Sequence, residues 1–298
     1  MKRKSVFLVL LSVFVMLLSG CSEIAQTSEE YIPPEYTPQA YPVAVEGISF
    51  EKAPSAVVCL SPTIADMLFE LDAADCMVAA NIEKNSFLYN NRGDFDIAQC
   101  SGAVNPDIDE ILSYSPDLVL TSTPMGAMDV KKITDSGAKF LYIPPACDIV
   151  SMMEMYSMLS LICYGDIVAM QKVDEATEPL FYSIENMSEQ ASDKSFAFLQ
   201  TQSFYPASDD TFIGSVLDAA YGDNVFADAR YSGDISKISE LAPDFIFLSS
   251  DIDEATLSEN ISLPESSHII HLKCDEKLTT ATNAMQIISS ASGYFAWA

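Results

Sequence analysis

The chain has 298 residues, of which 43 are acidic and 15 are basic, so its formal net charge at pH 7 is -28. A surface this acidic repels nucleic acid and anionic lipid headgroups, and we expect no nucleic-acid partner. The cysteines show no CxxC spacing and there are only two histidines, which argues against a structural zinc site or a histidine-rich metal centre. We therefore expect neither a bound metal nor a cofactor.

The N-terminal segment has the pattern of an export signal. Basic residues at positions 2–4 precede an apolar run from Val6 to Leu18, which is shorter than the ~20 residues that cross a bilayer. The run closes on Leu-Ser-Gly-Cys, which resembles the bacterial lipobox. This resemblance implies that residues 1–20 are removed and that Cys21 carries a fatty acyl anchor such as palmitate. An ordinary secretory signal followed by an incidental cysteine is the alternative.

The segment 21–50 is rich in Ser, Glu, Pro and Tyr and shows no periodic apolar pattern. Such a composition is typical of an extended, flexible tether. We predict that this tether holds a globular body off the membrane to which Cys21 anchors it.

Residues 51–148 carry the pattern of a parallel α/β lobe. Residues 56–60 are continuously apolar, as in a strand that is buried on both faces. A turn at 61–63 ends this run, and apolar residues at helical spacing follow it. Further strands are predicted at 77–80, 118–120 and 140–143, with a helix at 108–113. Alternating short strands and helices predict a doubly wound parallel sheet.

The second half of the chain repeats this plan 127 positions further on. Residues 107–123 and 234–250 share an Asp-Ile helix start, a Pro-Asp pair, an apolar strand and closing hydroxyls. Strands are predicted at 196–199 and 245–248, within a second lobe that spans 191–298. A long-period repeat indicates two similar lobes, and clefts between lobes commonly bind small ligands.

Residues 149–190 are predicted to form a long inter-lobe helix, because apolar residues recur on one face of the pattern. A helical connection is stiffer than extended strands, so we expect the hinge to bend little. Gly165 and Pro179 should interrupt or kink this helix.

Over nearly all of residues 54–292 the chain resembles the lipoprotein substrate-binding components of ABC importers for ferric siderophores, haem and vitamin B12. The resemblance rests on the order and spacing of several segments, namely 57–64 with 68–71, 105–119, 212–214 with 223–228, and the second Pro-Asp strand at 243–248. It implies two α/β lobes joined by one long helix, a ligand held in the cleft between them, and docking on an ABC permease. We expect the protein to be a monomer.

The resemblance also implies a docking role for one acidic side chain in each lobe, seven residues before the Pro of each Pro-Asp pair. The first such position holds Asp109, and the second holds Ser236, so Asp234 is the nearest acidic replacement. For Asp109, a plain helix N-terminal carboxylate that interacts with the helix dipole is an equal alternative.

In open α/β sheets, ligands bind beyond the carboxyl ends of the strands. This rule selects residues in both lobes as cleft candidates: Ser61, Pro62, Thr63, Asn81, Glu83, Thr123, Met125, Phe204, Tyr205 and Ser250. The two aromatic residues are suited to stacking on a large planar or chelate ligand. Arg230 follows a stretch that lies near the cleft in the family and is the candidate for a charged contact, with a surface ion pair as its alternative. Each of the other candidates has a solvated loop residue as its alternative.

Six cysteines follow Cys21, and an even number in an exported chain permits disulfides. Cys59 and Cys163 lie in apolar runs, which favours buried thiols, and the choice between thiols and disulfides stays open.

The sequence offers no enzyme motif: it lacks G-x-S-x-G, a P-loop and H-E-x-x-H. We predict an extracytoplasmic lipoprotein that captures a ferric siderophore, haem or a related tetrapyrrole and delivers it to an ABC permease. A cobalamin-binding member of the same family is one alternative, although Glu83 stands where B12-binding relatives have an aromatic residue. A surface lipoprotein that keeps the fold only to bind a partner protein is the other alternative, and Ser236 is its best support.

Overall fold

The computed structural model describes residues 40–295 except 85, 92, 94, 192, 201–203, 228–233 and 274–276. The predicted signal segment, Cys21, Arg230 and most of the tether lie outside the described residues. Within the described part, no helix is both long and apolar enough to cross a membrane.

The first sheet is entirely parallel, with the strand order β5-β4-β3-β6-β7. Its strands are β3 (Val57–Cys59), β4 (Met77–Ala80), β5 (Ala98–Gln99), β6 (Leu118–Thr121) and β7 (Lys139–Tyr142). The helices between them are α2 (Pro62–Glu70), the short 3-10 helix η1 (Ala74–Cys76), α3 (Phe87–Asn91), α4 (Ile108–Ser113) and α5 (Ala127–Asp135). The predicted parallel α/β fold is confirmed, and β3, β4, β6 and β7 differ from their predicted bounds by one residue at most at either end, whereas the two-residue strand β5 was not predicted.

The second sheet has the strand order β10-β8-β11-β12, with β9 paired antiparallel to β8. Its strands are β8 (Ser195–Gln200), β9 (Tyr205–Pro206), β10 (Asp223–Asn224), β11 (Phe245–Leu248) and β12 (His268–His271). The associated helices are α8 (Phe212–Tyr221), η2 (Ile235–Lys237), α9 (Ile238–Leu241), α10 (Glu254–Asn260), α11 (Ala281–Ser289) and α12 (Ser292–Phe295). Strand β11 pairs with β8 as β6 pairs with β3, so the sequence repeat is a structural repeat.

Both sheets are covered on both faces, which explains their continuous apolar runs. In β3, Val57 and Cys59 belong to one buried cluster and Val58 to another, because successive side chains point to opposite faces. In β8, Phe196 and Phe198 belong to that same first cluster, whereas Ala197 faces a third. One continuous core is therefore shared by the two sheets.

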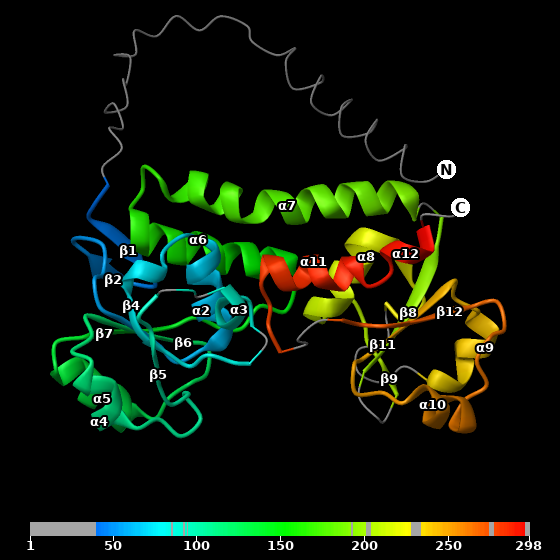
Figure 1. Ribbon diagram of the computed structural model, residues 1–298, viewed down its shortest axis with the longest axis horizontal. Helices are drawn as coiled ribbons and strands as arrows, with labels where there is room; N and C mark the ends of the chain where they lie inside the picture. The colour runs from blue at the N-terminus through cyan, green and yellow to red at the C-terminus, as the bar shows by residue number, and fades with distance from the viewer. Residues whose placement is uncertain are drawn as a thin grey trace, which may run out of the picture. The chain divides into compact units, whose positions relative to one another are not determined.

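The connection between the sheets is a pair of helices rather than one helix (Figure 1). Helix α6 (Ile149–Tyr164) ends at Gly165, which adopts a left-handed backbone with φ 72°, and α7 (Ala169–Gln190) follows. The predicted interruption at Gly165 is thus present, whereas Pro179 lies inside the continuous helix α7. Helix α7 packs against α6 and against two helices of the second half, α8 and α11.

The tether predicted over residues 21–50 is too long at its C-terminal end. Strands β1 (Val43–Val45) and β2 (Ile48–Phe50) form an antiparallel hairpin whose turn residues Glu46 and Gly47 both have positive φ. Val43, Val45 and Phe50 are buried in the main core, and β1 packs on α6. Strands of three residues are too short to produce a recognisable alternation in the sequence.

Candidate functional site

Two serine hydroxyls meet at the carboxyl edge of the first sheet. The chain moves outward from β3 to β4 and β5 and then returns to β6 on the other side, so β3 and β6 flank the topological switch point. Ser61 follows β3 and Ser122 follows β6, and their Oγ atoms lie 2.7 Å apart. Ser61 is also the N-cap of α2, where its Oγ accepts a hydrogen bond from the backbone N–H of Ile64 at 3.4 Å.

Other polar groups line the same edge. Asn81 follows β4, and its Oδ1 accepts a hydrogen bond from Nε2 of Gln99 at 3.5 Å. A Cβ on Gly102 would lie 2.6 Å from the Asn81 amide nitrogen, so glycine is required there if the amide is to keep its place. After β6, the Thr121 Oγ1 accepts from the Thr123 backbone N–H and donates to the Thr123 carbonyl, both at 3.0 Å. The edge is thus ordered by its own hydrogen bonds.

The predicted candidates of the first half divide into two groups. Ser61, Asn81 and Thr123 all lie at the carboxyl edge of the first sheet, and the half-buried Glu83 follows Asn81. Thr63 is buried within α2, and Met125 packs against the cluster on one face of the sheet. Pro62 is the first residue of α2, where its fixed φ suits the helix start.

In the second sheet, β8 and β11 correspond to β3 and β6. Ser249 follows β11, is buried, and donates its backbone N–H to the Leu199 carbonyl at 3.0 Å, while Ser250 is exposed. The predicted aromatic pair separates: Phe204 packs against the cluster that covers this sheet, whereas Tyr205 on β9 is 56% exposed. Of these two rings, Tyr205 is the one available to a ligand.

The two docking candidates lie at equivalent helix starts. Asp109 is exposed in the first turn of α4, behind the N-cap Asp107, whose Oδ1 accepts from the Glu110 backbone N–H at 3.0 Å. Asp234 is the N-cap of η2, and the Ser236 hydroxyl donates to its Oδ1 at 2.6 Å. Hydrogen bonds from Ser236 hold the pKa of Asp234 below its usual range. The serine in the second copy thus fixes a neighbouring carboxylate in its charged form.

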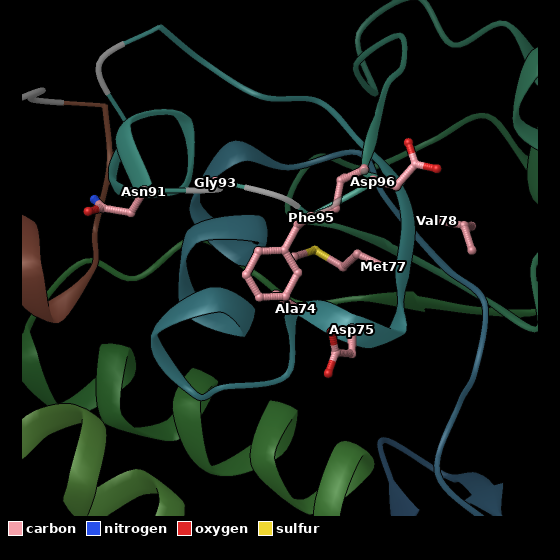
Figure 2. A pocket seen from close by; sticks show the side chains of 9 residues that line it. Ala74, Asp75, Met77, Val78, Asn91, Gly93, Phe95 and Asp96 are labelled. Atoms are coloured by element: carbon pink, nitrogen blue, oxygen red, sulfur yellow. The ribbon is translucent and has the colours of Figure 1, made fainter.

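A separate hollow with a volume of about 740 Å³ opens at the other end of the first sheet. It is lined by residues that precede β4 and β5 or lie at their first positions: Ala74, Asp75, Met77, Val78, Asn91, Gly93, Phe95, Asp96 and Ile97. Figure 2 shows the carboxylates of Asp75 and Asp96 pointing away from each other. No predicted cleft residue lines this hollow, and its polar groups do not converge on a ligand position.

Sequence reasoning missed a polar junction that joins α2, α6 and α11. The Tyr156 hydroxyl donates to Oε2 of Glu70 and accepts from the Ala281 backbone N–H at 2.9 Å. The other carboxylate oxygen of Glu70 accepts from the Thr282 backbone N–H at 3.3 Å. Burial is the main cause that raises the pKa of Glu70 to about 7, against the hydrogen bonds from Tyr156 and Thr282 that lower it. The only signal in the sequence was a carboxylate inside the apolar run 67–71.

Comparison with known proteins places this geometry among binding proteins. The sequence pattern of the family described as periplasmic binding protein matches residues 57–263. An uncharacterised ABC transporter substrate-binding lipoprotein of Bacillus subtilis (strain 168), YvrC, is 22% identical over 245 residues, which are 76% of this chain and 74% of that protein. A cobalamin-binding protein of Halobacterium salinarum is 21% identical over 193 residues, which are 65% of this chain and 52% of that protein.

A solved structure shows the same fold. The iron uptake ABC transporter substrate-binding protein PiuA of Streptococcus pneumoniae matches with a TM-score of 0.62 at 16% identity, over 86% of this chain and 98% of that one. At this level of identity, the likeness concerns the fold and does not transfer a ligand.

Proposed function

Because this chain belongs to the periplasmic binding protein family and is an extracytoplasmic substrate-binding protein of an ABC importer, we propose that it captures an iron complex, either a ferric siderophore or haem, or a related tetrapyrrole. It then delivers this ligand to the permease. The observation that carries the proposal is the polar carboxyl edge of the first sheet, where Ser61 and Ser122 meet at the switch point.

The chemistry of the candidate residues suits a large ligand with polar substituents. The hydroxyls of Ser122 and Thr123 and the amide of Asn81 offer both donors and acceptors for a ligand without charge, and the buried Ser61 holds the Ser122 hydroxyl in place. The exposed ring of Tyr205 offers a flat apolar surface for stacking. Arg230, outside the described residues, keeps its proposed role as the charged contact.

Ligand identity is tested by titrating the purified full chain with a panel of ferric siderophores, haem and cobalamin, followed by fluorescence quenching and ligand absorbance. We expect saturable binding of one iron complex or tetrapyrrole, with the ligand recovered chemically unchanged. Tyr205→Ala should weaken that binding about 10-fold or more, whereas Tyr182→Ala, an exposed tyrosine on α7, should leave it unchanged. Absence of binding to every ligand in the panel would contradict the proposal.

Cobalamin is the alternative ligand, and the name of the Halobacterium salinarum relative is what favours it. The same panel separates the cases, because a cobalamin-specific protein binds cobalamin and ignores the ferric siderophores and haem. A protein that retains the fold only to bind another protein would bind none of the ligands.

We also propose that Cys21 is lipidated and anchors the mature chain to the outer face of the cell membrane. Cys21→Ala should release the protein from the membrane fraction and abolish incorporation of labelled palmitate. Export of an unlabelled wild-type chain into the medium would instead support an ordinary secretory signal.

A further inference from the structure

Helix α11 of the second half begins on hydrogen-bond acceptors that come from other helices. It starts at Ala281 after the N-cap Thr280, and the N–H groups in the first turn of a helix have no acceptor within it. The Ala281 N–H donates to the Tyr156 hydroxyl at 2.9 Å, and the Thr282 N–H donates to Oε1 of Glu70 at 3.3 Å. Side chains from α6 and α2 therefore hold the start of α11.

This polar junction joins the two halves of the chain. Helix α11 otherwise packs chiefly on α7 and α8, whereas Glu70 is the last residue of α2 in the first half. The Tyr156 hydroxyl also donates to Oε2 of Glu70, so both carboxylate oxygens are engaged. Tyr156 and Ala281 are fully buried, and Glu70 is half-buried with its carboxylate at the inner end. One carboxyl group thus links three helices.

The surroundings of the Glu70 carboxylate disfavour its negative charge. Asp66, one turn earlier on α2, is buried, and its two carboxylate oxygens accept from the Phe87 and Leu88 backbone N–H groups at 2.9 Å each. Burial, with the charge of Asp66 as a smaller cause, raises the pKa of Glu70 to about 7, against the hydrogen bonds that lower it. The carboxyl group therefore exchanges its proton near neutral pH.

The described groups that face Glu70 from the other two helices are neutral. Burial is the main cause that raises the pKa of Tyr156 well above its usual value, so the hydroxyl of this residue stays protonated. The start of α11 faces the carboxylate with Thr280 and with the backbone N–H of Thr282. Of the titratable groups at the junction, which are Glu70, Asp66 and Tyr156, Glu70 is the one whose charge changes near neutral pH.

We propose that the polar junction is a proton-operated latch between the two halves of the chain, closed while Glu70 is protonated and open when it is ionised. Opening gives the proton to water and separates the carboxylate from the start of α11. Because the closed state binds this proton more tightly than a solvated carboxyl group does, raising the pH favours the open state. An extracytoplasmic protein meets changes in the external pH directly.

The latch and the candidate site lie at opposite ends of one helix. Helix α2 has Ser61 as its N-cap and ends at Glu70. Opening would therefore free the far end of the helix that carries Ser61, as well as the contact between the two halves. The latch does not depend on which ligand binds, so its test needs none.

The latch is tested by hydrogen exchange of the purified full chain, with single amides resolved by mass spectrometry from about pH 5.5 to about 8.5 and each rate referred to its intrinsic value. Protection of the Ala281 and Thr282 amides should fall by about 10-fold or more over this range, because both lose their acceptors. The Ala284 amide donates to the Thr280 carbonyl at 2.9 Å and should stay protected. Equal losses at all three amides would mean that α11 itself unfolds, which would overturn the proposal.

Two variants separate the latch from a merely structural contact. Glu70→Gln removes the titration and keeps an acceptor for Thr282, so its protection should not change with pH. Tyr156→Phe removes a donor that favours the charged carboxylate, so the loss of protection at Thr282 should move to higher pH. Glu189→Gln, at an exposed position on α7, is the matched control and should follow the wild type.

A wild-type profile in Glu70→Gln, or an unshifted loss in Tyr156→Phe, would show that Glu70 does not control the junction. Either variant decides the question if the other does not fold.

Discussion

Asp117 and Asp244, the aspartates of the two Pro-Asp pairs, hold the start of the neighbouring strand in each sheet. Asp117 accepts hydrogen bonds from the backbone N–H groups of Ser55 and Ala56, at 2.7 and 3.1 Å. Asp244 accepts from the Ser195 backbone N–H at 2.9 Å and pairs with Lys194 at 3.2 Å. The repeat therefore conserves a hydrogen-bonding role between the two halves of one chain, as well as a helix stop.

The first prediction concerns Asp244. Burial opposes the charged form, but hydrogen bonds from Ser195 and Lys194 outweigh it and hold the pKa of Asp244 below its usual value of 3.8. A lowered folded-state pKa stabilises the fold above about pH 4, and this contribution is lost as the pH falls further. Asp244→Ala should lower the free energy of unfolding by about 1 to 2 kcal/mol at pH 7 in urea titrations, and by less near pH 3. Asp174→Ala, at an exposed position on α7, should change neither value.

Glu70 gives a pH dependence of the opposite sign. Its pKa rises from an ordinary 4.5 to about 7 on folding, chiefly because the carboxylate is buried, with the charge of Asp66 also raising it. The folded state therefore binds a proton that the unfolded state releases between these values. The free energy of unfolding should fall as the pH rises from about 4.5 to about 7.

The second prediction compares the wild type with the Glu70→Gln variant, whose amide side chain does not titrate. Between pH 4.5 and 8 the wild type should lose on the order of 1 to 3 kcal/mol of stability relative to this variant, measured by urea unfolding at each pH. Glu189→Gln, at an exposed position near the end of α7, is the matched control and should run parallel to the wild type. Identical pH profiles for wild type and Glu70→Gln would contradict the assignment.

At the scale of elements, a single residue, Gly165, determines where helix α6 ends and the chain turns toward α7. Gly165 has φ 72°, and a Cβ there would lie 1.8 Å from the Ala40 carbonyl oxygen. Gly137 also has a positive φ, 95°, but a Cβ there would meet nothing within 4 Å. An alanine at position 137 would therefore introduce backbone strain alone, whereas an alanine at position 165 would introduce both strain and a steric clash.

The third prediction uses this contrast. Gly165→Ala should destabilise the protein by about 2 to 4 kcal/mol, because backbone strain and a backbone clash add. Gly137→Ala should cost only about 1 kcal/mol, from the strain of a left-handed alanine. Thermal unfolding of the two variants measures the difference, and equal costs would mean that the segment at Ala40 moves aside freely.

At the scale of the whole molecule, the two halves are alike in topology but unequal in their docking candidates. Asp109 stands free in the first turn of α4, whereas in the second half Ser236 fixes the carboxylate of Asp234. We expect Asp234 to present its charge in place of the residue at 236. Docking on a permease should then use a carboxylate from each half.

The fourth prediction tests this asymmetry with Asp109→Asn and Asp234→Asn. Each should reduce co-purification with the permease and ligand uptake several-fold, because each removes one charge–charge contact, while ligand affinity in solution stays unchanged. Asp174→Asn should behave as the wild type. If only Asp109→Asn lowers permease binding, docking depends on the first half alone.

The sequence by itself determined the parallel α/β class, the two-fold repeat, the positions of the main strands and the family, because continuous apolar runs and turn residues encode short-range structure. It also predicted which strand ends carry hydroxyls. Only the tertiary structure decided that Ser61 and Ser122 meet, that Phe204 is packed while Tyr205 is exposed, and that residues 43–50 fold back as a hairpin. The junction of Glu70 with Tyr156 could not be predicted from the sequence either, because it joins residues 86 positions apart through packing that no local pattern records.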